Sequence, residues 1–417
     1  MPETSNPARR LLERFALIAF GLYHIPLFLN NYPSLGGGGF SDHGLAVSWG
    51  HAFTPAGMWV ARTLFHMSGP MLDAAAGDNG DTGEEFGRLL LAIAIGVIGA
   101  AAWTLADRKK PRGEWVEGTL KVLLRYSIAL GLASYAVAKL LPTQFPPLTP
   151  SSLENRVGDL APMRLLWNFM QYSRPYAFFG GLMEITVVVL LCFRRTTTLG
   201  ALICIAVMSN VALLNLAYGV PVKLYSTMMV VSAAVLVLYD APRLFAMFVK
   251  NEPVAPAPAS PLITDRLPAA ARWTIKIVLV GSVIVSSYVA VEPSYAAQNV
   301  APAAIDGTWV ITSFALNGKS LDSSGNRARW RRLIVEPNVV TIRMETDSLT
   351  RCRHTPSTDT GALKFACTKG RQGDFRWTRT GDVLQLDGVF DSTKVSASAL
   401  HTEYPLLRSK FRWIFDR

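Results

Sequence analysis

The stretch Ala161–Ser226 reads APMRLLWNFMQYSRPYAFFGGLMEITVVVLLCFRRTTTLGALICIAVMSNVALLNLAYGVPVKLYS. It contains two apolar runs, Tyr176–Phe193 and Leu199–Tyr218, on either side of the basic and hydroxylated turn Arg194–Thr198. Each run has about the length that an apolar helix needs to cross a bilayer. The stretch therefore predicts two antiparallel membrane-spanning helices joined by a short turn.

The rest of the chain extends this pattern. Its 417 residues are 50% hydrophobic and only 17% charged, whereas an average protein is about 25% charged. We therefore predict an α-helical polytopic membrane bundle of about seven spans. The candidate spans are Phe15–Asn31, Gly87–Ala106, Tyr126–Leu141, Tyr176–Phe193, Leu199–Tyr218, Leu224–Tyr239 and Thr274–Val291.

The net charge of +11 comes largely from basic residues in short connections between these runs. If the N-terminus lies inside, the inner connections collect most of them, among them Arg9, Arg125, Arg194 and Arg272, as the positive-inside rule requires. This distribution favours a role in topology over nucleic-acid binding. We expect a cytoplasmic N-terminus, an extracytoplasmic C-terminal domain and no nucleic-acid partner.

Composition divides the chain into five regions. We expect an N-terminal two-span region with a long outer loop, a four-helix core, a Pro/Ala-rich cytoplasmic linker, a seventh span and an extracytoplasmic β-domain. Their boundaries are 1–124, 125–250, 251–273, 274–299 and 300–417. The seventh span ends in Ser-Tyr-Ala-Ala-Gln, which resembles a cleavage site after Ala296 or Ala297. The alternative is an uncleaved anchor, and both leave the β-domain outside.

From about Ala304 the hydrophobic period changes. Short alternating runs, separated by turns such as Asn317-Gly318, predict an all-β barrel or sandwich of about eight antiparallel strands. The segment Gly307-Thr308-Trp309 resembles the opening motif of small lipocalin-like barrels. By the same resemblance Arg412, in the last run, is expected to pack on Trp309.

Two cysteines, Cys352 and Cys367, fall in one predicted hairpin of this domain. An oxidising compartment outside the membrane would favour a disulfide between them. The histidines and cysteines show no metal-ligand spacing, so we expect no metal site.

Polar residues interrupt the spans in their outer halves, where a pocket opening outward would need them. An ionisable group in a span is costly and usually faces the bundle interior. At a helical rise of 1.5 Å per residue, a deeper layer lies about 10–12 Å from the outer ends and a second layer lies near those ends. The deeper layer holds Glu184, Asn210, His24 and Tyr135, and the outer layer holds Lys139, Asn215 and Lys223. In the alternative interpretation the asparagines only join neighbouring helices and Lys139 reaches the head groups.

This region is similar to the DoxX family of small four-helix membrane proteins, and especially to a bacterial subgroup with a β-rich tail. The shared features are Lys139, Gln144-Phe145, Pro162-Met163, Leu165–Trp167, Phe169-Met170, Ser173, Tyr176, Glu184, the Arg-Arg-Thr-Thr run from Arg194, Asn210, Asn215 and Val220–Lys223. One departure is Gly219, where an acidic partner for Lys223 would be expected. The resemblance implies a DoxX-like four-helix core over 125–250 and a bacterial plasma (inner) membrane location.

The resemblance also implies a function, because DoxX relatives include membrane subunits of quinone-linked oxidoreductases. By this analogy Glu184 relays a proton, Lys139 stabilises the reduced oxygen of a quinone, and a membrane redox protein is the partner. The remaining cofactor contacts would come from Tyr135, Asn210, Asn215, Lys223 and His24.

The main alternative is a non-enzymatic membrane protein that binds or handles a lipid or small ligand, with a lipocalin-like outer domain. Three arginines, Arg156, Arg164 and Arg174, lie outside against the charge rule and would then hold an anionic lipid head group. A transporter is least favoured, because the inner halves of the spans read as nearly uniformly apolar.

Overall fold

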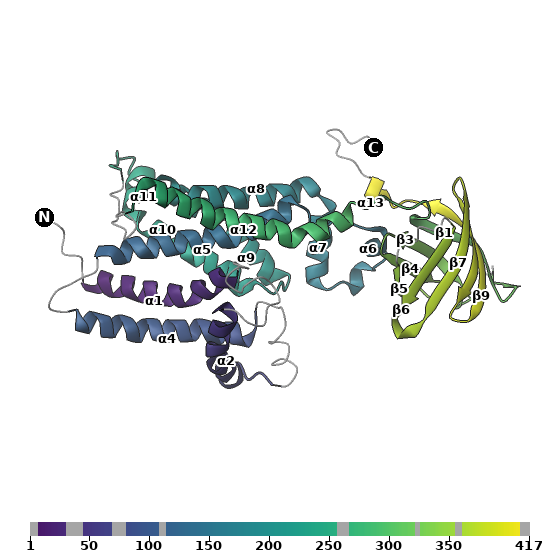
Figure 1. Ribbon diagram of the computed structural model, residues 1–417, viewed down its shortest axis with the longest axis horizontal. Coiled ribbons are helices and arrows are strands. Elements are labelled where there is room, and N and C mark those ends of the chain that lie inside the picture. Colours follow the sequence, from purple (N-terminus) through teal and green to yellow (C-terminus); the bar gives the residue numbers. More distant parts are fainter. Residues whose placement is uncertain are drawn as a thin grey trace. The chain divides into compact units, whose positions relative to one another are not determined.

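The computed structural model describes most of the chain as two compact units. Unit 1 comprises residues up to 145 together with 173–295, and unit 2 comprises 146–172 together with 296 onward. Unit 1 is helical, whereas unit 2 carries the β-strands (Figure 1). The described residues are 7–30, 45–68, 81–107, 114–256, 267–321, 326–354 and 361–408.

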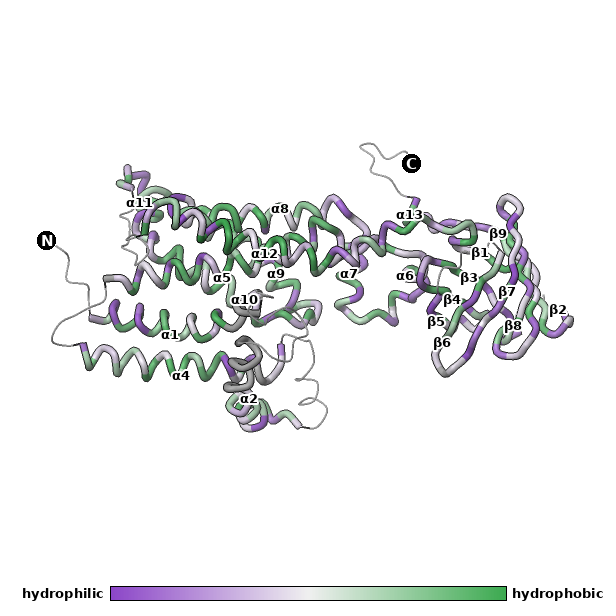
Figure 2. Tube along the Cα trace, viewed as in Figure 1, coloured by the Kyte–Doolittle hydropathy of each residue, from purple (hydrophilic) through white to green (hydrophobic). Residues whose placement is uncertain are grey.

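Unit 1 is a bundle whose long helices run roughly parallel to one another (Figure 1). Hydrophobic residues extend over much of their length, as the colouring in Figure 2 shows. The elements are α1 (Pro7–Asn30), α2 (Leu45–Thr63), α4 (Gly83–Ala106), α5 (Glu114–Leu140), α8 (Arg174–Leu191), η4 (Arg194–Thr196), α9 (Thr197–Ala217), α10 (Lys223–Leu238), α11 (Ala241–Phe248) and α12 (Ala269–Gln298).

The central element of the bundle is α5. It packs against α1, α8 and α10, and 61% of its apolar window is buried, compared with 33% for α8 and 6% for α12. A helix that is buried nearly all round needs apolar residues on every face. The run Ile128–Ala133 supplies them, together with Leu124 one turn earlier and Leu120 two turns earlier.

Fewer helices than expected are long and apolar enough to cross a membrane. Among the described residues five pass on length and composition, and six pass if α10 and α11, bent by 73°, form one broken span. The expected first span, Phe15–Asn31, corresponds to α1 except for Asn31, which lies outside the described residues, and the first two turns of α1 carry Arg9, Arg10, Glu13 and Arg14. These charges shorten its apolar part, so α1 is not among the five. The prediction of seven therefore exceeds what the described helices support.

Unit 2 contains a closed antiparallel barrel. The strands follow one another around the sheet, β2 extends the end of β1, and β9 pairs back onto β1 to close the barrel with eight strands. This confirms the predicted all-β domain and selects the barrel over the sandwich. The strands are β1 (Gly307–Leu316), β2 (Lys319–Ser320), β3 (Trp330–Glu336), β4 (Val339–Met344), β5 (Leu349–His354), β6 (Ala362–Cys367), β7 (Gln372–Thr380), β8 (Val383–Phe390) and β9 (Thr393–Thr402).

Most strands match an alternating run, but β5 does not appear among the predicted ones. Its inward-facing residues are Cys352 and His354, and polar or basic residues surround them, so it lacks an aliphatic alternation. The last expected run, which contains Arg412, lies outside the described residues. The predicted turn at Asn317-Gly318 is present, with positive φ at both residues, as a tight hairpin between β1 and β2 requires.

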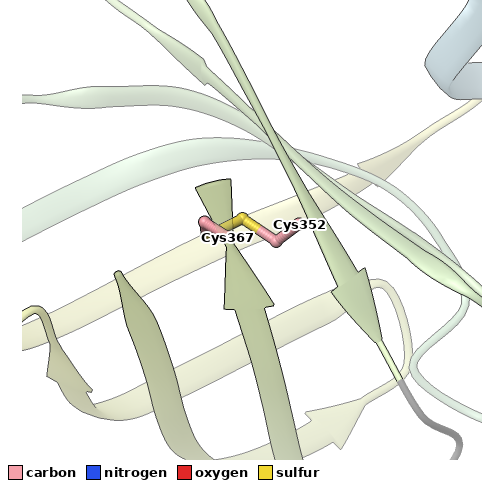
Figure 3. Close-up of a disulfide and its surroundings, with 2 residues drawn as sticks. All are labelled: Cys352 and Cys367. Carbon is pink, nitrogen blue, oxygen red and sulfur yellow. A yellow bond between two sulfur atoms is a disulfide. The ribbon is translucent and has the colours of Figure 1, made fainter. Parts of the chain in front are cut away.

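Aromatic and sulfur-containing side chains fill the barrel interior. Trp309 is fully buried and donates a hydrogen bond from Nε1 to the Ile305 carbonyl at 2.8 Å. The guanidinium carbon of Arg379 lies 5.2 Å from the Trp309 ring centre, in the role that the sequence analysis gave to Arg412. Cys352 and Cys367 face each other across β5 and β6 and form a disulfide (Figure 3).

The connection between α5 and α8 folds with the barrel and not with the helices. It contains α6 (Pro150–Leu153), η3 (Val157–Asp159) and α7 (Pro162–Tyr172), whereas the predicted boundary at 125–250 assigned it to the helical core. The reason is a set of polar contacts with the outer face of the barrel. The Ser151 amide donates to Glu336 at 2.9 Å, and the Thr341 hydroxyl donates to the Ser151 oxygen at 2.9 Å.

Glu154 is the centre of these contacts, and its side chain is fully buried. It accepts hydrogen bonds from Arg332 at 2.8 Å and from Arg343 and Tyr404. Burial alone would raise the pKa of this carboxyl, but the three hydrogen bonds together outweigh burial and hold the pKa below its ordinary value. The carboxylate therefore favours attachment of α6 to the barrel above a pH of about 4.3, and this contribution is lost as the pH falls through the lowered value.

Replacing this carboxylate should loosen α6. We expect Glu154→Gln to cost about 2 kcal/mol at neutral pH, or roughly thirty-fold in local opening, because charge-assisted hydrogen bonds are lost. Hydrogen exchange at the Ser151 amide in the full-length protein, corrected for intrinsic rates, measures this opening. The wild type should also open more below about pH 4, whereas the variant should not.

The matched control is Glu403→Gln, which removes an exposed carboxylate paired with Arg408 at 2.8 Å. It should leave the Ser151 amide unchanged. Equal protection of that amide in wild type and Glu154→Gln would contradict the assigned role of Glu154.

Candidate functional site

The two residues that the sequence analysis placed at the chemical centre are in direct contact. Lys139 in the last turn of α5 donates from Nζ to both carboxylate oxygens of Glu184 on α8, at 2.7 and 2.9 Å. Both residues are buried, with exposed fractions of 9% and 2%. The helices meet closely because residue 181 is glycine: a Cβ there would lie 2.9 Å from the Lys139 Cβ.

Tyr135 lies one turn before Lys139 on α5 and completes this cluster. The Lys139 Nζ is 5.4 Å from the Tyr135 ring centre, within the range of a cation–π contact. The Tyr135 ring in turn lies 6.1 Å from that of Tyr225 on α10. The Lys139–Glu184 pair is thus closed on itself, with an aromatic side chain over the ammonium.

The other predicted cofactor residues do not join this cluster. His24 contacts Ser232 on α10 at 2.9 Å, and Asn215 donates to Ser226 at 3.0 Å, so each joins two helices by a separate polar contact. Asn210 is exposed on α9. The structure therefore distributes the predicted outer pocket over several separate contacts.

Lys223 finds an acidic partner despite the glycine at position 219. Its Nζ lies 3.0 Å from Asp81, which also accepts the backbone amides of Lys223 and Leu224 at the start of α10. A carboxylate at a helix N-terminus satisfies amides that have no partner within the helix. Asp81 thus takes the place of the acidic residue that the DoxX resemblance places at 219.

The three outer arginines belong to both units of the chain. Arg156 forms an ion pair with Asp347 of the barrel, within unit 2. Arg164 and Arg174 are exposed and belong to different units. The Arg156–Asp347 pair attaches the α5–α8 connection to the barrel, and the head-group role of the three arginines stays a prediction.

A cleft that the sequence analysis did not predict lies elsewhere in unit 1. It has a volume of about 550 Å³, and we call it the basic cleft. Residues of α1, α5 and α12 and of the η4 turn line it, and four of them are cationic. The lining residues are His24, Ile25, Val122, Leu123, Arg125, Tyr126, Ser127, Arg194, Ala269, Arg272, Trp273, Ile275, Lys276 and Leu279.

Arg125 is the buried polar residue of this cleft, with an exposed fraction of 4%. Its Nε donates to the Leu191 carbonyl at 2.9 Å, which satisfies one of the free carbonyls at the C-terminus of α8. Its Nη2 is buried and has no hydrogen-bond partner among the described residues. One edge of the guanidinium is therefore occupied and another nitrogen remains available.

The positions of these cations explain why the sequence did not reveal the cleft. Arg125, Arg194 and Arg272 were each assigned to an inner connection, where the positive-inside rule accounts for them singly. The candidate membrane span within α5 begins at Trp115, whereas the predicted span began at Tyr126, so Arg125 lies inside the span. Only helix packing brings these residues together, and the inner part of the bundle is not uniformly apolar as expected.

Within the described residues, no group of three or more His, Cys, Asp or Glu side chains could hold a metal ion.

The fold and these sites define a class: a helical-bundle protein, with several apolar helices of membrane-spanning length, joined to a C-terminal β-barrel domain. A curated relative, the uncharacterized protein YwoB of Bacillus subtilis (strain 168), is 30% identical over 139 residues. These residues are 33% of this chain and 88% of that protein. The chain belongs to the family of this Bacillus protein. No family model and no solved structure matches the chain.

The Lys139–Glu184 pair predicts a strong energetic coupling. We expect Lys139→Met or Glu184→Gln alone to destabilise the protein by about 3–5 kcal/mol, because each leaves a buried charge without its partner. The double variant Lys139→Met/Glu184→Leu should recover most of that loss. Thermal unfolding of the full-length protein in detergent measures all three.

The surface pair Lys364–Asp374 is the control, because both side chains are largely exposed and exposed pairs contribute only about 0.2–1 kcal/mol. Additive losses in the Lys139 and Glu184 double variant would show that the two side chains are not coupled.

Proposed function

We propose that this protein is a multi-pass membrane protein that binds an amphiphilic lipid or small molecule inside its helical bundle and does not itself catalyse a reaction. The observation that carries this proposal is the basic cleft. Its volume of about 550 Å³ lies within the range of small-molecule sites, which are mostly apolar with a few polar groups. Apolar residues such as Leu123, Ile275 and Leu279 line it beside the four cations.

The barrel supports placing the ligand in the helical unit. Lipocalin-like barrels can hold a ligand only where the interior leaves space. Here the interior is filled by large side chains, among them Trp309, Phe314, Trp330 and Phe375, each at most 2% exposed. The outer domain is therefore assigned a supporting role, while ligand binding belongs to the bundle.

Membrane insertion and topology are part of the proposal. Six of the described helices are long and apolar enough to span a bilayer if α10 and α11 form one broken span. With α1 as a seventh span, the basic connections favour a cytoplasmic N-terminus. This topology places the barrel outside the bacterial plasma membrane, where its disulfide would persist. It also places the basic cleft at the cytoplasmic leaflet, because Arg125, Arg194 and Arg272 all belong to the inner side.

Filling the cleft should remove the ligand. We expect Val122→Trp, which places a large ring on the cleft wall, to reduce lipid or small-molecule retention several-fold in gently purified protein. Mass spectrometry of the organic extract, normalised to protein, measures retention.

Val189→Trp is the matched control, because Val189 is on α8, is 52% exposed and does not line the cleft. It should retain the wild-type amount. A wild-type protein that carries no amphiphile in excess of bulk lipid would refute the proposed function.

A second candidate function is a quinone-binding subunit of a membrane oxidoreductase in the DoxX family. The observation that favours it is the buried Lys139–Glu184 pair with Tyr135 beside it. A carboxylate and an ammonium at one site could exchange a proton and stabilise a reduced quinone oxygen. It ranks second because both charges are already satisfied by each other.

The two candidates differ in which variants lose the ligand. If quinone binds at the pair, wild type should retain quinone, and Glu184→Gln and Lys139→Ala should lose it while Val122→Trp keeps it. The charge-swapped variant Lys139→Glu/Glu184→Lys keeps an ion pair and serves as the stability control. A quinone that remains bound in folded Glu184→Gln would exclude this site.

A further inference from the structure

The geometry points to the chemical class of the ligand. We propose that the basic cleft holds the phosphate head group of an anionic amphiphile, with Arg125 as the residue that hydrogen-bonds it and Arg194, Arg272 and Lys276 providing surrounding positive charge. This inference rests on the proposed function, because it names the ligand class of the same cleft.

The first argument is the charge of the cleft wall. Four of its described lining residues are cationic and none is acidic. Arg125 is buried in this wall, so the positive charge of Lys276 in the same cleft is screened less there than it would be in water. An anion bound among these cations would offset their repulsion.

Nearby carboxylates do not supply that anion, because they have other partners. Glu117 near the start of α5 pairs with Arg9 and Lys121. Asp240, which follows α10, pairs with Arg243 at 2.8 Å and accepts from Thr198. These two carboxylates are therefore already paired with groups other than Arg125.

The second argument is the bonding of Arg125. A guanidinium has five N–H donors in a planar fork that matches two oxygens of a phosphate. Here Nε is held by the Leu191 carbonyl, which orients the plane, whereas the buried Nη2 has no acceptor. Buried polar groups in proteins are almost always hydrogen-bonded. A phosphate oxygen in the cleft would satisfy this nitrogen.

A simple topological role does not explain this residue. Basic residues that only fix membrane orientation lie in water-exposed connections, as Arg194 does on the exposed η4 turn. Arg125 is 4% exposed and lines the cleft. It is thus placed to bind a buried group and not to contact solvent.

The apolar part of the cleft favours an amphiphile over a free anion. Leu123, Ile275 and Leu279 provide a surface for a hydrocarbon chain. The ring centre of Trp273, near the start of α12, lies 5.1 Å from the Lys276 Nζ. Tryptophan is enriched at the membrane level where lipid head groups meet the hydrocarbon chains. Charge and hydrocarbon surface together match a phosphate linked to an alkyl or acyl chain.

The test uses the full-length protein in detergent, titrated with three probes by native mass spectrometry. The probes are phosphatidylglycerol, zwitterionic phosphatidylcholine and inorganic phosphate. We expect wild type to prefer phosphatidylglycerol over phosphatidylcholine by at least about tenfold. Arg125→Gln should reduce that preference about tenfold, which is the loss of roughly one charge-assisted hydrogen bond, and Arg125→Lys should retain part of it.

Two further variants guard against trivial results. Arg164→Gln removes an exposed arginine of unit 2 and should leave the preference unchanged. Lys276→Gln removes a cleft charge that caps no helix, so it tests the inference if Arg125→Gln fails to fold. It should weaken the preference for phosphatidylglycerol by several-fold.

The outcomes separate this inference from the proposed function. Equal binding of both phospholipids in wild type, or an unchanged preference in both cleft variants, would overturn the phosphate inference while amphiphile binding stands. Competition by inorganic phosphate as strong as by phosphatidylglycerol would overturn the amphiphile part and assign a free-phosphate site. Binding of neither phospholipid would contradict the inference, and retention lost only in Val122→Trp would then still support the proposed function.

Discussion

A charge removed from water must find an opposite charge or a hydrogen bond nearby, and the helical unit is organised by this constraint. Lys139 and Glu184 join α5 to α8, and Gly181 lets the two helices approach closely enough for both carboxylate oxygens to accept from one ammonium. Other buried polar groups obey the same rule across other helix pairs: Asn215 with Ser226 and His24 with Ser232. Each contact closes locally, because a polar group left open in an apolar bundle is costly.

The basic cleft departs from this rule and is the better candidate for function for that reason. Natural proteins leave few buried donors without an acceptor, so an exception needs a specific explanation. Several buried side-chain atoms of the described residues lack a hydrogen-bond partner, and two of them, Arg125 Nη2 and the Tyr126 hydroxyl oxygen, belong to residues that line the cleft. Arg125 has an unpartnered Nη2 inside a cavity that also receives three other cations and apolar side chains. The predicted outer site shows the opposite condition, since its central charges neutralise each other. The ion pair leaves neither charge without a partner, whereas Arg125 keeps one nitrogen without an acceptor.

Local patterns predicted the elements better than they predicted the site. The alternating runs identified most barrel strands because each strand places one face toward the core. Strand β5 was not predicted, because its buried residues are Cys352 and His354 and its sequence shows no alternation of aliphatic residues. The Lys139–Glu184 contact was accessible because both residues are ionisable and lie in the outer halves of adjacent predicted spans. By contrast, Arg125 and Lys276 are 151 positions apart, and nothing in their local sequence indicates that α5 and α12 share a cleft. The role of Glu154 could not be predicted either, because its partners lie far away in the sequence, on β3, on β4 and after β9.

The two ends of the α5–α8 contact also differ in what they leave available. At one end Lys139 and Glu184 pair with each other. At the other end Arg125 donates to the carbonyl of Leu191, the last residue of α8. The C-terminus of a helix carries partial negative charge, so a bare anion beside it would be repelled. In the proposed binding mode the guanidinium lies between the α8 terminus and the phosphate and contacts both. Arg125 would then both cap α8 and bind the ligand. Its planar guanidinium has donors on several edges, so it can contact both negative groups at once. A lysine at this position would have to reach both groups from a single nitrogen.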